Sequence, residues 1–133
     1  MKSLKKIAFA VIALLLFQHA NAQKKAQWKE LSDFHNVMSK TFHPAEEGNL
    51  QPLKDNSADL LAKARIWQIS VYPAGYKVDE TKIVLAELTS KCDEVNRAVI
   101  AKKSDAELKK LITEAHDVFH QVAEKCRQPE GTK

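Results

Sequence analysis

Apolar residues recur along this chain with the period of an α-helix, in four separate stretches. Within each stretch they are spaced three and four positions apart, which places them on one face of a helix. The pattern predicts helices near residues 25–43, 50–71, 79–102 and 105–126. The first face holds Trp28, Leu31, Phe34, His35, Val37, Met38 and Phe42, and the second holds Leu53, Leu60, Leu61, Ala64, Trp67 and Val71. The third holds Ile83, Leu85, Leu88, Cys92, Val95 and Val99, and the fourth holds Leu108, Leu111, Ile112, Ala115, Phe119, Val122 and Cys126.

Caps and helix-breaking residues mark the predicted helix ends. Pro44 is expected to end the first helix, and Asn49 and Asp79 are placed to cap the second and third. Ser104 and Glu107 form a capping box before the fourth helix, in which each side chain accepts a hydrogen bond from the other residue's backbone amide.

Short connections between four consecutive helices favour an antiparallel up-down four-helix bundle, in which the first and last helices are neighbours. Only three glycines and four prolines occur in the chain, which argues against a β-sandwich or a disordered protein. We therefore expect an all-α fold with one bundle domain over residues 23–127. A disordered tail is expected over residues 128–133, with fraying from Arg127 onward.

The N-terminus has the pattern of a secretory signal peptide over residues 1–22. Three lysines precede an apolar run over residues 7–17, and the small residues from Ala20 to Ala22 supply a cleavage site. An apolar run of eleven residues is too short to span a bilayer, which takes about 20. We expect a mature chain that begins at Gln23, is not anchored in a membrane, and is periplasmic if the source is a Gram-negative bacterium.

Two classes of function have little support in the sequence. Removal of the leader lowers the formal net charge from +4 to +1, because the leader carries three lysines and no acidic residue. A nearly neutral chain lacks the basic excess that binds nucleic-acid phosphates, so no nucleic-acid partner is expected. No residues stand at a spacing that implies an activated nucleophile or an acid–base couple, so we do not expect an enzyme.

All four histidines outside the leader fall in the first or the last predicted helical stretch: His35, His43, His116 and His120. The first and third predicted helices end, and the fourth begins, at one common end of the bundle. A helix rises about 1.5 Å per residue, so the distances along the bundle axis from this end (the depths) are about 12 Å for His35, about 15 Å for Cys92 and about 16 Å for His116. These three residues are expected to share one layer, with Met38 above it and His120 below it.

The histidines predict a site for a transition metal. His116 and His120 are one helical turn apart, so they present two imidazoles on one face, a good arrangement for a divalent ion. Together with His35 and Cys92 they form the set expected to bind copper or zinc. His43, beside an acidic turn, can form a separate loop site, although a solvated turn is the simpler interpretation. Each histidine can also be a hydrogen-bonded boundary residue without a ligand.

Two segments resemble the cytochrome c′ family of four-helix bundles. Residues 115–120, Ala-His-Asp-Val-Phe-His, resemble the end of the family's Cys-x-x-Cys-His-x-x-Phe-Arg segment on its last helix. Residues 52–57, Pro-Leu-Lys-Asp-Asn-Ser, followed by the stripe over residues 64–67, resemble its second helix. The resemblance implies that His116 takes the place of the proximal haem ligand.

The same resemblance implies a haem held without covalent bonds, since Ile112 and Ala115 stand where the family has its haem-attaching cysteines. In the related cytochrome b562 fold, a methionine of the first helix and a histidine of the last helix bind the haem. Met38 and His116 correspond to that pair, although the depth of His35 matches His116 better. The implied haem-binding residues are therefore His116, His35, Met38 and His120.

Cys92 and Cys126 have two possible states. Export into an oxidising compartment favours a disulfide between them. In a simple helical hairpin, however, their depths differ by about 16 Å, whereas a disulfide needs Cα atoms within about 7 Å. Either the helices bend near these residues, or the thiols are separate and Cys92 is buried or a metal ligand.

Three functions therefore remain open. The first is an exported cytochrome c′-like bundle that binds haem non-covalently for electron transfer or ligand binding. The second is a periplasmic copper or zinc protein that uses the same histidines. The third is a bundle without a cofactor that acts through its surface. A homodimer is possible under each of them.

Overall fold

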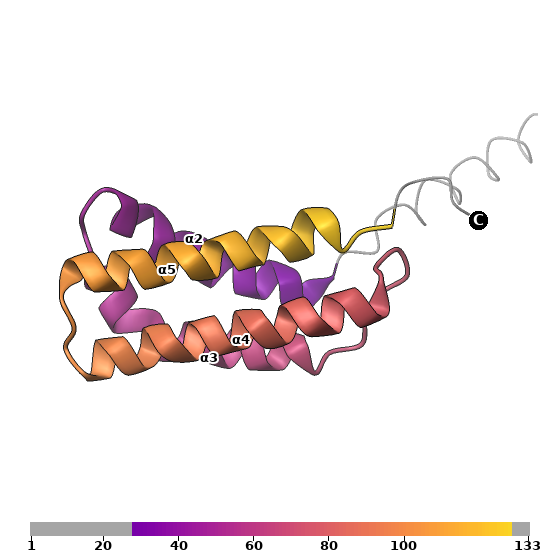
Figure 1. The fold of residues 1–133 in the computed structure, drawn as a ribbon, viewed down its shortest axis with the longest axis horizontal. Helices are drawn as coiled ribbons and strands as arrows, with labels where there is room; N and C mark the ends of the chain where they lie inside the picture. The colour runs from indigo at the N-terminus through magenta and orange to yellow at the C-terminus, as the bar shows by residue number, and fades with distance from the viewer. Residues whose placement is uncertain (1–27, 129–133) are drawn as a thin grey trace, which may run out of the picture.

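The computed structural model describes residues 28–128 as four α-helices and one π-helical turn (Figure 1). The α-helices are α2 (Lys29–Glu46), α3 (Gln51–Gln68), α4 (Val78–Ile100) and α5 (Asp105–His120), and the π-helical turn is η2 (Gln121–Lys125). The predicted all-α four-helix fold is confirmed. The expected signal peptide and the predicted start of the first helix at residue 25 lie outside the described residues.

Contacts between α2 and α3 pair the start of one helix with the end of the other. Trp28 Nε1, just before α2, donates to Ser70 Oγ, just after α3, at 3.0 Å. Further along α2, Lys40 Nζ donates to Asn56 Oδ1, near the start of α3, at 3.2 Å. This is the contact order of antiparallel neighbours. The helices α2 and α5 are also in contact, as predicted for the first and last helices.

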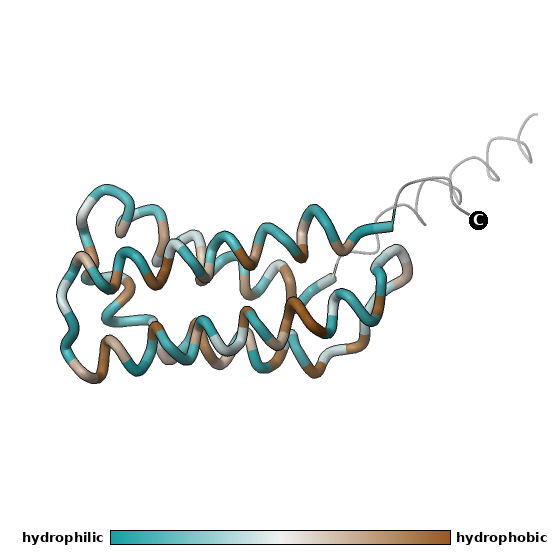
Figure 2. The backbone as a smooth tube through the Cα atoms, in the orientation of Figure 1, coloured by the Kyte–Doolittle hydropathy of each residue, from teal (hydrophilic) through white to brown (hydrophobic). Residues whose placement is uncertain are grey.

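The apolar faces of the four helices meet in one core (Figure 2). Its largest fully buried side chains are Trp67, Phe34 and Met38. Three residues of the predicted faces are exposed instead, His35, Val71 and Ile83. Val71 follows the end of α3 and is not helical. Ile83 is two residues from the buried Leu85, and residues two apart in an α-helix point about 200° apart, so both cannot face the core.

The helix α2 does not end at Pro44, as predicted, but continues to Glu46. Proline removes one backbone hydrogen bond and its ring crowds the carbonyl four residues earlier, but only Ala45 and Glu46 follow Pro44 in the helix. The helix is closed by Gly48, which has φ +90°. The Gly48 amide donates to the Ala45 carbonyl at 3.0 Å, and the Asn49 amide donates to the Pro44 carbonyl at 2.9 Å. These two bonds define a Schellman motif.

The helix α4 ends in the same motif with lysine in place of glycine. The Lys102 amide donates to the Val99 carbonyl and the Lys103 amide to the Ala98 carbonyl, each at 3.0 Å. Lys102 has φ 53°, the left-handed region that a side chain with a Cβ disfavours. The two helix ends therefore form a natural pair for comparing lysine with glycine at one backbone geometry.

We expect Lys102→Gly to raise the free energy of unfolding by about 1 kcal/mol, because glycine removes the left-handed strain. Gly48→Ala should lower it by a similar amount. A Cβ at Gly48 would meet no atom within 4 Å, so that cost comes from the backbone alone. Urea denaturation of both variants measures the two shifts. A destabilised Lys102→Gly variant would contradict this account of the α4 end.

The starts of the helices follow the predicted caps in part. Ser104 Oγ accepts a hydrogen bond from the Glu107 amide at 3.2 Å, as the capping box predicts. Asn49 Oδ1 accepts from the Gln51 amide at 3.2 Å, although the residue at the cap position is Leu50. Asp79 does not cap α4, because the helix begins at Val78 and Asp79 lies within its first turn.

The described C-terminal residues are held at the end of the bundle where the α3–α4 loop lies. Tyr76 and Arg127 form an isolated β-bridge. The Lys77 amide donates to the Cys126 carbonyl and the Gln128 amide to the Gly75 carbonyl, both at 2.8 Å. The prediction that the chain frays from Arg127 is therefore wrong for residues 127 and 128. Residues 129–133 lie outside the described part of the chain.

Candidate metal-binding site

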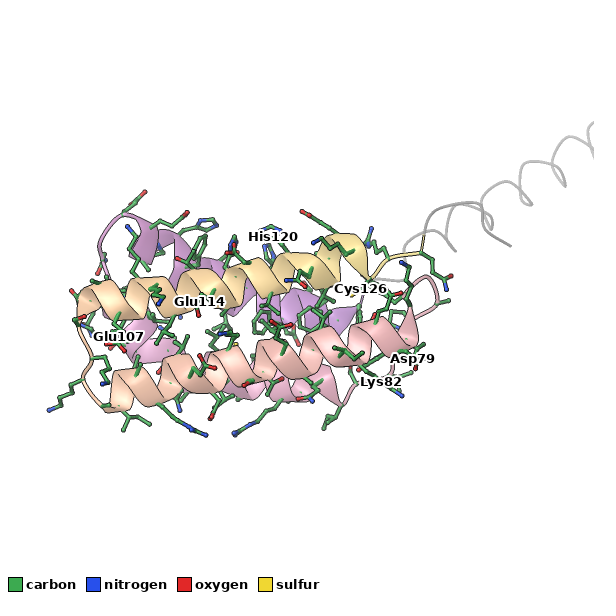
Figure 3. All side chains as sticks on the ribbon, in the orientation of Figure 1. Asp79, Lys82, Glu107, Glu114, His120 and Cys126 are labelled. Atoms are coloured by element: carbon green, nitrogen blue, oxygen red, sulfur yellow. The ribbon has the colours of Figure 1, made fainter. Side chains whose placement is uncertain are left out.

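The four histidines lie on α2 and α5, as predicted, but at different depths and with different neighbours. His35, His43 and His120 are exposed, and His116 is half-buried. Figure 3 shows His120 on the edge of α5 that faces away from α4. The histidines therefore line the outer side of the contact between α2 and α5, and they do not point into the core.

His116 and His120 form a close pair. Their Nε2 atoms are 3.2 Å apart, at hydrogen-bond distance, and the two residues are separated by one turn of α5. Two neutral imidazoles at this distance share one proton, which one Nε2 donates to the lone pair of the other. A cation can bind both lone pairs once the proton on the donating Nε2 has moved to Nδ1 of the same ring.

The distance between the two nitrogens favours a tetrahedral ion. Two imidazole nitrogens bound to tetrahedral zinc at about 2.05 Å are about 3.3 Å apart. Two adjacent nitrogens of a square-planar ion at a similar bond length are only about 2.9 Å apart. The 3.2 Å between His116 Nε2 and His120 Nε2 is closer to the tetrahedral value. Two nitrogens at this separation can bind one tetrahedral ion once both lone pairs turn toward it.

A carboxylate stands on the other side of the His120 ring. His120 Nδ1 lies 3.4 Å from Glu124 Oε1. A carboxylate that accepts a hydrogen bond from Nδ1 leaves Nε2 with a free lone pair, and Glu124 stands close enough to be the candidate for this role. Glu124 lies in the π-helical turn η2, which directly follows His120. Such single turns of π-helix occur frequently at functional sites.

The electrostatics of the site favour a neutral His116. Partial burial lowers the pKa of His116, and the neighbouring His120 lowers it further. The carboxylates of Asp117 and Glu46 act in the opposite direction, and the net direction is downward. A lowered pKa keeps the imidazole uncharged at neutral pH, and the uncharged form is the one that binds metals.

Aromatic rings of α2 and α5 stack on two of the histidines. The His116 ring stacks on Phe42 with 3.7 Å between ring centres and 11° between planes. The His35 ring stacks on Phe119, with ring centres 5.6 Å apart. Phe119 in turn contacts the core residues Phe34 and Trp67. The Phe42 ring therefore covers one face of the His116 imidazole.

His35, Cys92 and His116, which were expected at one level of the bundle, do not lie together in the structure. The ring beside His116 is Phe42, and His35 lies beside Phe119. Among residues 28–128, no group of three or more His, Cys, Asp or Glu side chains could hold a metal ion.

The physical reason is the register of the two helices. The predicted depths assumed that the first helix ends at residue 43, level with the start of the last. Instead α2 continues to Glu46, whose carbonyl accepts a hydrogen bond from Lys109 Nζ of α5 at 3.1 Å. The first residue of α5, Asp105, pairs with Lys54 of α3.

Met38 and Cys92 lie in the core. Their side chains are 1% and 0% exposed, and they pack among the other buried residues of the bundle. Ile112 and Ala115, at the positions where the cytochrome c′ resemblance has its attachment cysteines, are also fully buried. Neither Met38 nor Cys92 shares the outer surface on which His116 and His120 meet.

Both cysteines are free thiols and are buried. The structure therefore agrees with the expectation of separate thiols and not with a disulfide. Burial raises the pKa of Cys92 to about 12. A thiol with so high a pKa is protonated at neutral pH and is a poor nucleophile.

We expect iodoacetamide at neutral pH to leave Cys92 and Cys126 unmodified in the folded protein, because neither thiol is accessible. Mass spectrometry of the intact chain measures this. The same reaction in concentrated urea is the control, and it should label both residues. Rapid labelling of Cys92 without denaturant would contradict its place in the core.

His43 forms a separate contact near the end of α2. Its Nδ1 is 3.3 Å from Glu46 Oε2, one turn along the helix, and both side chains are exposed. This arrangement is that of a solvated turn, the simpler of the two interpretations of this region. Since His43 is surface-exposed and outside the His116 and His120 pair, it provides a control for the experiments below.

Sequence reasoning missed one residue of the site, Glu124. The signal was present, because Glu124 follows His120 by four positions, the spacing of neighbours on a helical face. The π-helical character of that turn is not visible in the pattern of apolar residues.

Comparison with protein-family models, with curated proteins and with solved structures finds no match to this chain. Within residues 28–128, none of the helices combines the length and the apolar character needed to cross a membrane.

Proposed function

We propose that this protein is an exported transition-metal-binding helical bundle whose ligands are the Nε2 atoms of His116 and His120. The observation that carries the proposal is the 3.2 Å distance between these two atoms on the accessible side of α5. The proximity of Glu124 to His120 Nδ1 supports it. Export rests on the signal-peptide pattern of residues 1–22 alone.

Zinc is the ion that the distance favours, and copper is the alternative that the ligand type allows. Imidazole binds both ions, and copper(II) generally binds more tightly than zinc at a given set of ligands. The separation of the two nitrogens is closer to tetrahedral than to square-planar geometry. We therefore expect zinc to require a smaller change in the separation of the two nitrogens than copper(II) does.

Haem binding, which the cytochrome c′ resemblance implies, stays a prediction and is the second candidate. A haem bound through His116 would have its iron at Nε2, with the ring system across that edge of the imidazole. His120 Nε2 already stands at that edge, 3.2 Å from His116 Nε2. Further in, Phe34 and Trp67 are fully buried and pack with Phe119. The described residues thus fit a single ion better than a large planar ring system.

Calorimetric titration of the chelator-treated chain with zinc and copper(II) tests the proposal. Saturable zinc binding supports it, and the absence of binding for both ions overturns it. Reconstitution with haemin is the parallel test of the second candidate. An intense Soret band would place haem ahead of zinc, and a protein that binds neither haem nor metal would be a cofactor-free bundle.

A further inference from the structure

The His116 and His120 pair is an incomplete site within one chain. Zinc in a structural site takes four ligands in tetrahedral geometry. One chain supplies two imidazoles, and no third His, Cys, Asp or Glu joins them among residues 28–128. Two positions on the ion therefore remain open toward solvent, on a surface where the His120 side chain is 47% exposed.

We infer that a second copy of this chain completes the site, so that one zinc ion is held by His116 and His120 of two protomers. This inference rests on the proposed function. A second copy presents the same two nitrogens at the same spacing. With a two-fold axis through the ion, the same surface of each chain supplies two of the four ligands. Two-fold dimers are the commonest symmetric assemblies.

The charges around the pair fit this arrangement. Four neutral imidazoles leave the double positive charge of zinc unbalanced. Each chain places the Glu124 carboxylate behind its His120, so two copies would bring two negative charges to the ion.

The position on α5 leaves room for a partner. Figure 3 shows His120 at the outer edge of the bundle, on the side of α5 away from α4. Asp117, beside His116, is exposed, and Gln121, beside His120, is half-buried. Phe42 of α2 covers one face of the His116 ring, so a partner would approach the pair from the exposed His120 side of α5.

Sedimentation of the purified chain with zinc and with a chelator, combined with calorimetric stoichiometry, tests the inference. We expect a dimer with one zinc ion per two chains, which the chelator returns to monomers. The double variant His116→Ala with His120→Ala should stay monomeric in zinc and should not pair with the wild-type chain. His43→Ala, which removes a surface histidine outside the pair, should still dimerise with zinc.

The outcomes separate the inference from the proposed function. A monomer with one zinc ion per chain overturns the dimer and leaves the proposed function intact, with solvent or a small molecule in the open positions. A dimer that persists in chelator, or that forms equally in the double variant, also overturns it. A chain that binds no zinc at all overturns both.

Discussion

Replacing His120 by alanine is expected to abolish zinc retention, and replacing His116 should do the same. In the wild-type chain the Nε2 atoms of the two imidazoles are 3.2 Å apart, and each substitution leaves only one of them. Loss of a residue behind a ligand typically costs about 10–100-fold in metal affinity, and loss of a ligand itself should cost more. Calorimetric titration of each variant against the wild-type chain measures the change in affinity.

Two control variants make this prediction specific. His35→Ala removes an exposed histidine that stacks on Phe119, near the pair but outside it, and should leave zinc affinity unchanged. Glu124→Gln keeps the shape of the side chain and removes its charge, so it should weaken binding by about tenfold, as an outer-sphere partner does. Equal losses in His35→Ala and His120→Ala would contradict the assignment of the pair.

Replacing Trp67 by alanine is expected to cost about 3–5 kcal/mol of the free energy of unfolding, the usual range for a large buried aromatic residue. The Trp67 side chain is fully buried. Its ring lies against Trp28 and Phe34, with ring centres 5.5 and 5.4 Å away, and against Phe119 at 6.0 Å. Removing it opens a cavity where α2, α3 and α5 meet. Urea denaturation measures the loss.

Ile69→Ala is the matched control, because Ile69 lies two residues after Trp67 and is largely exposed. Exposed substitutions usually change stability by less than about 0.5 kcal/mol. The conservative variant Trp67→Phe should lose much less than Trp67→Ala. It keeps a ring in the core and removes the buried indole nitrogen, which has no hydrogen-bond partner in the described structure. A loss in Trp67→Ala no larger than in Ile69→Ala would contradict the account of the core.

The helices could be predicted because each depends on local signals. Apolar residues at spacings of three and four define a helical face wherever the rest of the chain lies, and Ser104 caps α5 through a contact three residues away. The errors fall at helix ends. The sequence predicts that Pro44 ends α2. In the structure α2 ends at Glu46, and Gly48, two residues later, closes it with a positive φ. Val71 was assigned to a helix that had already ended.

The site could be predicted in part for the same reason. His116 and His120 meet within one turn of one helix, so their spacing in the sequence is enough to place them together. The layer of His35, Cys92 and His116 depends on how far one helix slides past another. In the structure Phe42 lies beside His116 and Phe119 lies beside His35, a register that the spacing of residues does not encode.

The central claim is that His116 and His120 bind one metal ion through their Nε2 atoms. Nuclear magnetic resonance of the histidine side-chain nitrogens, recorded as zinc is added to the chelator-treated chain, tests it most directly. We predict that the Nε2 signals of His116 and His120 move together to values typical of metal-bound nitrogen, while those of His35 and His43 stay in place. Unchanged signals of His116 and His120 at saturating zinc, or equal shifts of all four histidines, would contradict the claim.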